Sequence, residues 1–142
     1  MANPLLSDRF VDFVLHDVLD ASSLCALPAF ADHSRETFDL WLGACRRVGR
    51  EVLLPSYRAM DEAPPRLEDG QVRVHPRMRG IWKELAELGV IAATRPGSVG
   101  GQQLPLTVST FASAYLMAGN LSAYGYAGLT TGTAPRPGMV QP

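Results

Sequence analysis

The sequence predicts an all-α fold, a small helical bundle, from two observations. Four segments repeat apolar residues every three or four positions, which places them on one face of a helix. No two segments show the alternation expected of paired strands, so one-sided helices must cover one another. The chain has 142 residues, 46% of them hydrophobic, which is enough to build one buried core.

The first predicted helix spans residues 7–20, with Ser7 or Asp8 as its N-cap. Its wide apolar face predicts packing against a larger body. That face consists of Phe10, Val11, Val14, Leu15, Val18 and Leu19. Residues 21–33 form a connector interrupted by Pro28.

The second predicted helix begins near Asp32 or Ser34 and continues to about residue 54, where Pro55 kinks or ends it. Arginines lie off its apolar stripe, and we expect them to form a solvated face with an Arg47–Glu51 pair rather than an anion site. The stripe itself consists of Phe38, Trp41, Leu42, Cys45, Val48, Gly49 and Val52.

Residues 61–76 form a polar connection with a turn at Asp69-Gly70, and we expect no sheet there. A third helix over residues 76–88 ends at Gly89, and a fourth covers residues 105–118. Glycines in residues 120–134 weaken any helix there, but they would let another backbone or a ligand come close. The two stripes are Met78, Ile81, Trp82, Leu85 and Leu88, then Val108, Phe111, Ala112, Tyr115 and Leu116.

The composition and the first ten residues narrow the classes of function that this chain can have. A net charge of −1 gives no basic surface for nucleic acid. No apolar run approaches the ~20 residues that span a bilayer. The first ten residues lack the layout of a signal peptide, so we expect a cytoplasmic protein in which Cys25 and Cys45 form no disulfide.

Residue patterns predict no catalytic centre and no metal site. We expect none of His16, His33 and His75 to have a second ligand at metal-binding spacing, as in His-Glu-x-x-His. The glycine-rich turn at residues 97–101 is followed by no Gly-Lys-Ser/Thr, so it predicts a connector between helices rather than a phosphate cradle. The paired carboxylates at residues 61–69 lie in a solvated loop, where nothing would shift their pKa values.

Three pieces of the chain, in order, resemble the N-terminal helical domain of acyl-CoA dehydrogenases. Residues 4–11 (Pro-Leu-Leu-Ser-Asp-Arg-Phe-Val) with residues 18–20 (Val-Leu-Asp) resemble the N-terminal extension of the larger bacterial branch. Residues 82–89 (Trp-Lys-Glu-Leu-Ala-Glu-Leu-Gly) followed by residues 100–105 (Gly-Gly-Gln-Gln-Leu-Pro) resemble the core signature of that domain. Residues 128–132 (Gly-Leu-Thr-Thr-Gly) resemble the helix beside the acyl chain.

The resemblance implies an N-terminal extension with one short helix at residues 1–33, the helical domain at residues 34–134, and a Pro-rich tail outside the family pattern at residues 135–142. It implies oxidation of the Cα–Cβ bond of a fatty acyl-CoA, with FAD accepting the hydride. The family's catalytic glutamate and most FAD contacts belong to later domains, so no catalytic residue is carried over. FAD is therefore implied for a complete enzyme rather than for this chain alone.

In a complete enzyme, the resemblance makes Tyr124, Tyr126, Leu129 and Thr130 the candidate walls of the acyl-CoA pocket. Packing between helices is the alternative role for each of them.

The chain departs from the family at the turn that begins at Pro96, which lacks the usual acidic residue, and in its tail. These departures favour a truncated dehydrogenase-like protein that is inactive alone. Two alternatives stay open: a non-enzymatic helical module that associates through uncovered apolar helix faces, and one half of a split flavoenzyme.

Overall fold

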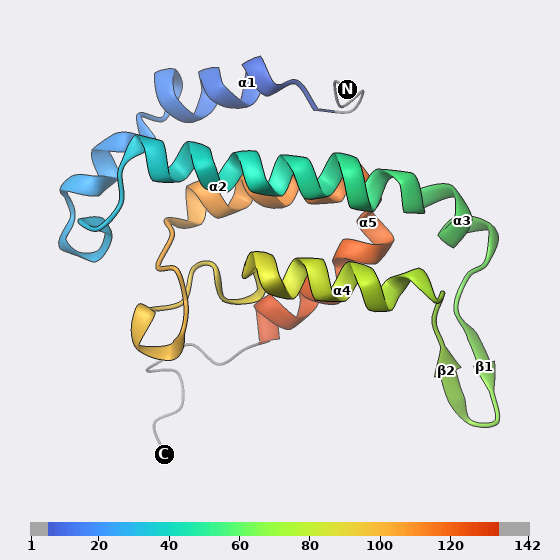
Figure 1. Ribbon diagram of the computed structural model, residues 1–142. Helices are drawn as coiled ribbons and strands as arrows, with labels where there is room; N and C mark the ends of the chain where they lie inside the picture. The colour runs from blue at the N-terminus through green and yellow to red at the C-terminus, as the bar shows by residue number, and fades with distance from the viewer. Residues whose placement is uncertain (1–5, 134–142) are drawn as a thin grey trace.

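The computed structural model describes residues 6–133 and is mostly helical, which confirms the predicted class. The predicted tail at residues 135–142, and the start of the predicted extension at residues 1–5, lie outside the described residues. Helix α2 is central, with α1 along one side of it and with α4 and α5 on the other (Figure 1). The five α-helices are α1 (Asp8–Asp12), α2 (Arg35–Val48), α3 (Tyr57–Glu62), α4 (Arg77–Leu88) and α5 (Leu106–Thr133).

The N-terminal helix forms where expected, but it buries a narrower face. The Ser7 side chain accepts a hydrogen bond from the Phe10 amide, and α1 continues as a π-helical turn, Phe13–Val18. Val11 and Leu15 are buried, whereas the predicted face members Phe10, Val18 and Leu19 are 58%, 58% and 50% exposed. A π-helical turn contains more residues than an α-helical turn, which changes the residues that face the core. In this segment His16 is buried next to Leu15, and Val18 is exposed.

Helix α2 matches its prediction closely. Ser34 and Thr37 form a reciprocal capping box at its start, and the predicted stripe is buried from Phe38 to Gly49. The helical path then continues through a π-helical segment, Gly49–Leu53, and a 3₁₀ turn, Leu54–Ser56, into α3. Pro55 sits in the 3₁₀ turn, where the regular hydrogen-bond ladder is already interrupted, so it bends the path without ending it.

The expectation of no sheet was wrong. Strands β1 (Arg66–Glu68) and β2 (Gln71–Arg73) pair antiparallel, with Leu67 opposite Val72. Asp69 and Gly70 both have positive φ, 50° and 73°, which is the geometry of a two-residue type I′ hairpin turn. Every strand residue is exposed, so the hairpin projects from the helical body and adds nothing to the core (Figure 1).

Helix α5 bends sharply at Asn120, whose φ of −161° and ψ of 97° are not helical. The bend separates a first arm, residues 106–119, from a second arm, residues 121–133. The Asn120 side chain is buried: its Oδ1 accepts from the Ala123 amide at 3.0 Å, and its Nδ2 donates to Ser56 Oγ at 3.0 Å. Asn120 therefore caps the second arm and ties the bend to the segment before α3.

Two glycines allow α5 to cross the end of α2 at close range. A Cβ on Gly49 would lie 2.6 Å from the carbonyl oxygen of Tyr115, and a Cβ on Gly119 would overlap the carbonyl of Gly49. The sequence predicted close approach within residues 120–134, but Gly125 faces open space and Gly128 faces the ring of Tyr124. The close contact lies instead where the two helix backbones meet, just before the bend.

The core is continuous and draws on all the longer helices. It contains the predicted stripes of α2, α4 and the first arm of α5, with four exceptions. Trp82 is exposed, and Val52, Leu88 and Phe111 are half-buried. Across residues 6–133, no helix combines the length and apolar character needed to cross a membrane.

The close crossing predicts that substitutions of two glycines have opposite effects on stability. Gly49→Ala should lower the free energy of unfolding by about 1–3 kcal/mol, because the added methyl group must push the backbones apart. Gly43→Ala, in the same helix but facing open space, should raise it by up to about 1 kcal/mol, because alanine favours helix. Urea unfolding of both variants provides the measurement, and equal effects would contradict a close crossing.

Candidate functional site

The four predicted acyl-contact residues lie on the second arm of α5 but face different surroundings. Tyr124 turns back to the first arm, where its hydroxyl is 2.7 Å from Ser113 Oγ. Tyr126 is 40% exposed and lines a pocket, and Leu129 is 75% exposed. The Thr130 hydroxyl donates to the Tyr126 carbonyl at 2.8 Å. The structure thus places Tyr126 in a pocket and the other three outside its lining.

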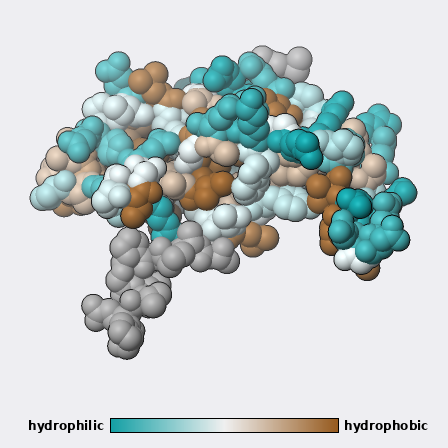
Figure 2. Space-filling view, turned by 60° about the horizontal axis from the view of Figure 1, so that its bottom comes forward, coloured by the Kyte–Doolittle hydropathy of each residue, from teal (hydrophilic) through white to brown (hydrophobic). Residues whose placement is uncertain are grey.

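The pocket beside Tyr126 is a hollow of about 180 Å³ where α3, the start of α4 and the second arm of α5 meet. Its wall is mainly apolar, and hydrophobic residues gather beside the hydrophilic hairpin on the face shown in Figure 2. His75 lines it, with Nδ1 accepting from the Arg77 amide at 3.2 Å. Such a wall suits a hydrocarbon or aromatic group. The main apolar lining residues are Met60, Pro64, Pro65, Val74 and Met78.

A second hollow of about 170 Å³ lies between the N-terminal helix and α2, and it is polar. Asp8 contacts Arg50 at 2.5 Å and Arg46 at 3.2 Å, so α1 is joined to α2 by charge as well as by Val11 and Leu15. Arg46 and Arg50, two of the arginines expected on a solvated face, therefore turn toward α1, and Arg50 is largely buried. Arg47 is exposed, as expected.

Three pKa values in and beside this polar hollow are shifted. Partial burial raises the pKa of Asp8, but hydrogen bonds from Arg50 and Tyr115, with the nearby guanidinium charges, outweigh it and lower the pKa below 3.8. Burial, and then the Asp8 charge, raise the pKa of Tyr115 to about 12, so its phenol stays protonated. Burial also raises the pKa of Cys45 to about 12, which leaves an inert thiol.

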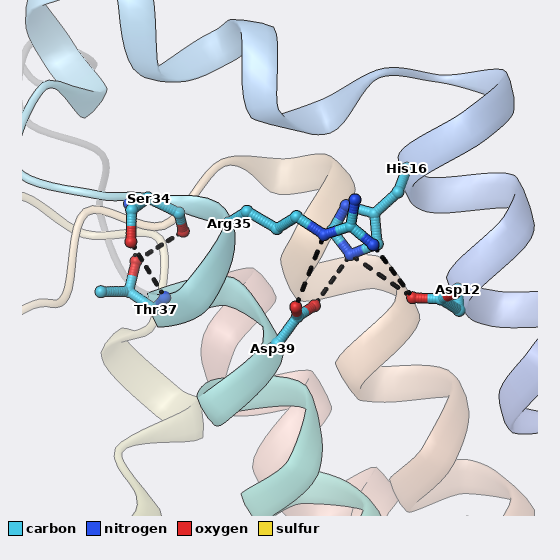
Figure 3. A network of polar contacts seen from close by, with 6 residues as sticks. All are labelled: Asp12, His16, Ser34, Arg35, Thr37 and Asp39. Atoms are coloured by element: carbon cyan, nitrogen blue, oxygen red, sulfur yellow. Dashed lines mark hydrogen bonds and ion pairs between the residues drawn. The ribbon is translucent and has the colours of Figure 1, made fainter.

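His16 forms a polar cluster with Asp12, Asp39 and Arg35 (Figure 3). The histidine and both carboxylates also line this hollow. Its Nε2 lies 2.8 Å from Asp39 Oδ1 on α2 and 3.9 Å from Asp12 Oδ1 at the end of α1. Arg35 approaches the same carboxylates, with Nη2 at 3.6 Å from Asp12 and Nε at 3.7 Å from Asp39. One ligand atom from each of Asp12, His16 and Asp39 lies within 4.8 Å of the others, a set that could hold a metal ion.

This cluster was not predicted from the sequence. The expectation that no histidine has a carboxylate at ligand spacing was wrong at His16, because Asp12 precedes it by four residues and shares its helix face. That spacing was the available signal. Asp39 could not be found from spacing, because it joins the cluster only when α1 packs on α2.

No protein-family model, curated protein or solved structure matches this chain.

The Asp8 contacts predict a stability difference that depends on pH. The pKa of Asp8 is lowered by folding, so its contribution is present above pH 3.8 and is lost as the pH falls through the lower, folded-state pKa. Asp8→Asn should lower the free energy of unfolding at neutral pH by about 1 kcal/mol or less, because the carboxylate is partly exposed.

Urea unfolding at neutral pH and well below pH 3.8 measures this difference, which should shrink in acid. Asp17→Asn, an exposed carboxylate on the same helical segment, is the matched control and should show little effect at either pH. A difference that grows in acid would contradict the assignment.

Proposed function

We propose that this chain supplies the N-terminal helical domain of a cytoplasmic acyl-CoA dehydrogenase-like flavoenzyme. The ordered resemblance of its three sequence pieces carries the proposal. In the fold these pieces correspond to the N-terminal helix, to α4 with the loop that leads to α5, and to the second arm of α5.

The contacts of the loop before α5 support a structural role for residues 100–105. A Cβ on Gly101 would overlap the backbone of Arg95, so only glycine fits there without movement. The carbonyl of Gln102 accepts from His33 Nε2 at 2.9 Å, and the side chain of Gln103 donates to the Ala29 carbonyl at 2.5 Å. These two hydrogen bonds fasten the connector before α2 to the loop before α5, and the side-chain bond accounts for glutamine at position 103 without any catalytic role.

The second arm of α5 supports a role in acyl binding. Tyr126, with Met60, Val74 and Met78, lines the apolar pocket, and Leu129 lies one helical turn further along the exposed side. In a complete enzyme these side chains would contact the hydrocarbon part of the substrate, while Tyr124 and Thr130 hold the helix that carries them through their hydroxyl groups.

The apolar pocket beside Tyr126 is too small for FAD. The apolar pocket measures about 180 Å³, below the ~300–1,000 Å³ of clefts that hold drug-sized ligands and cofactors. Within the proposal, FAD and the base that takes the α proton belong to the later domains of the complete enzyme that the resemblance implies. The chain alone is expected to bind acyl groups without oxidising them.

A non-enzymatic interaction module is the second candidate, and the exposed side chains of the N-terminal helix favour it. Phe10 and Phe13 are 58% and 53% exposed, and Val18 beside them is 58% exposed. Exposed apolar groups that lie together favour association. Light scattering after size-exclusion chromatography distinguishes the interaction module from the dehydrogenase-like domain. A molar mass that rises with protein concentration in the parent chain, and that is lower in Phe13→Ser, favours the module.

Acyl binding is tested with octanoyl-CoA and free CoA as the two probes. The purified chain should bind octanoyl-CoA more tightly than CoA, and Tyr126→Ala should reduce that preference several-fold. Tyr57→Ala, which removes another exposed tyrosine that does not line the pocket, is the control. Calorimetric titration measures both affinities, and equal binding of the two probes would contradict the acyl assignment.

The visible absorption of the same preparation tests the remaining part of the proposal. It should show no flavin, and octanoyl-CoA should not reduce an electron-accepting dye. A yellow chain that catalyses this reduction would contradict the inference that this chain alone is inactive.

A further inference from the structure

The His16 cluster has the composition and shape of a cation site. His16 and Asp12 lie one helical turn apart on the N-terminal helix, and Asp39 faces them from α2. The His16 side chain is 2% exposed, and its Nε2 points at the two carboxylates rather than at solvent (Figure 3). A buried imidazole with two carboxylates is a donor set suited to ions of the zinc class.

The distances allow all three donors to meet on one ion. Ligand atoms that share an ion at about 2.0–2.2 Å lie about 3–3.5 Å from one another. The separations from Nε2, 2.8 Å to Asp39 and 3.9 Å to Asp12, lie on either side of this range. Because both carboxylates are partly exposed, small side-chain rotations suffice, and the adjoining hollow of about 170 Å³ has room for waters that complete the coordination.

Binding of a metal through Nε2 requires a neutral imidazole ring that carries its proton on Nδ1. The Nδ1 atom is buried and has no hydrogen-bond partner among the described residues. The bound ion would take the place of the hydrogen bond between Nε2 and Asp39 Oδ1. Since Nδ1 has no acceptor to orient the ring, the site lacks a contact that commonly strengthens metal binding by ten- to hundred-fold.

Arg35 is the competing cation. Its guanidinium contacts both carboxylates at 3.6 and 3.7 Å, and its side chain is 56% exposed. An arginine held this loosely can swing into solvent when an ion binds. The Arg35 guanidinium therefore lowers the affinity of the site for a metal ion, because the ion must displace the guanidinium before the carboxylates can turn inward.

We propose that Asp12, His16 and Asp39 bind one divalent transition-metal ion of the zinc class, which fastens the N-terminal helix to α2. The ion would link side chains of both helices across their contact, where Val11 and Leu15 are the fully buried apolar residues of the described N-terminal helix. The site is independent of the acyl pocket, which lies at the opposite end of α2.

Two titrations of the chelator-treated chain test this proposal. Zn²⁺ is followed by calorimetry, and Co²⁺ by its visible absorption bands. One ion per chain is expected, and His16→Gln and Asp39→Asn should each weaken binding by about tenfold or more. Asp17→Asn, an exposed carboxylate one residue after His16, should leave the affinity unchanged. No binding by the parent chain, or binding that none of the ligand variants weakens, would overturn the proposal.

Two further variants test the proposal if replacing His16 or Asp39 prevents folding. Asp12→Asn alters a mostly exposed side chain and should weaken binding, whereas Arg35→Ala removes the competing charge and should strengthen it. Zn²⁺ should also raise the midpoint of thermal unfolding of the parent chain and not of Asp39→Asn, because an ion that binds only the folded state stabilises it. An Arg35→Ala variant that binds Zn²⁺ more weakly would contradict the competition described here.

Discussion

Helix α5 crosses the end of α2 at a distance that only glycine permits, and then bends. At the crossing, Gly49 meets the carbonyl of Tyr115, and Gly119 meets the carbonyl of Gly49. One residue later the buried Asn120 leaves helical geometry and bonds to Ser56, in the turn that carries the α2 path into α3. A close crossing of two helix backbones requires small residues, and a buried side-chain amide requires hydrogen-bond partners. Together these contacts fix the direction of both arms of α5.

Both hollows depend on this arrangement. The first arm runs along α2 and brings Tyr115 to Asp8, so the N-terminal helix docks on α2 and α5 at once. The second arm is directed across α3 and α4, which places Tyr126 over Met60 and Met78. A straight α5 would carry Tyr126 away from these residues. The acyl-binding proposal therefore depends on the bend, while the metal proposal depends on the docked N-terminal helix.

The sequence predicts what periodicity and local chemistry determine. The stripe of α2, its start near Ser34 and the stop at Gly89 follow from spacing and residue type alone. The hairpin also had a local signal, the Asp-Gly pair at residues 69–70, but short polar strands carry no hydrophobic pattern to support it. His16 and the Gly49–Gly119 contact were missed for another reason. A π-helical turn changes which side chains are buried, and pairs of residues 23 or 70 positions apart meet only through packing.

The central claim is that the buried amide of Asn120 couples the bend of α5 to the segment before α3. A double-mutant cycle with Ser56→Ala and Asn120→Ala tests it directly by urea unfolding. The two side chains share a hydrogen bond of 3.0 Å, so the double variant should be less destabilised than the sum of the singles. The expected coupling energy is about 0.5–3 kcal/mol in magnitude. Additive effects would show that the two residues act separately, which would contradict this account of how α5 is held.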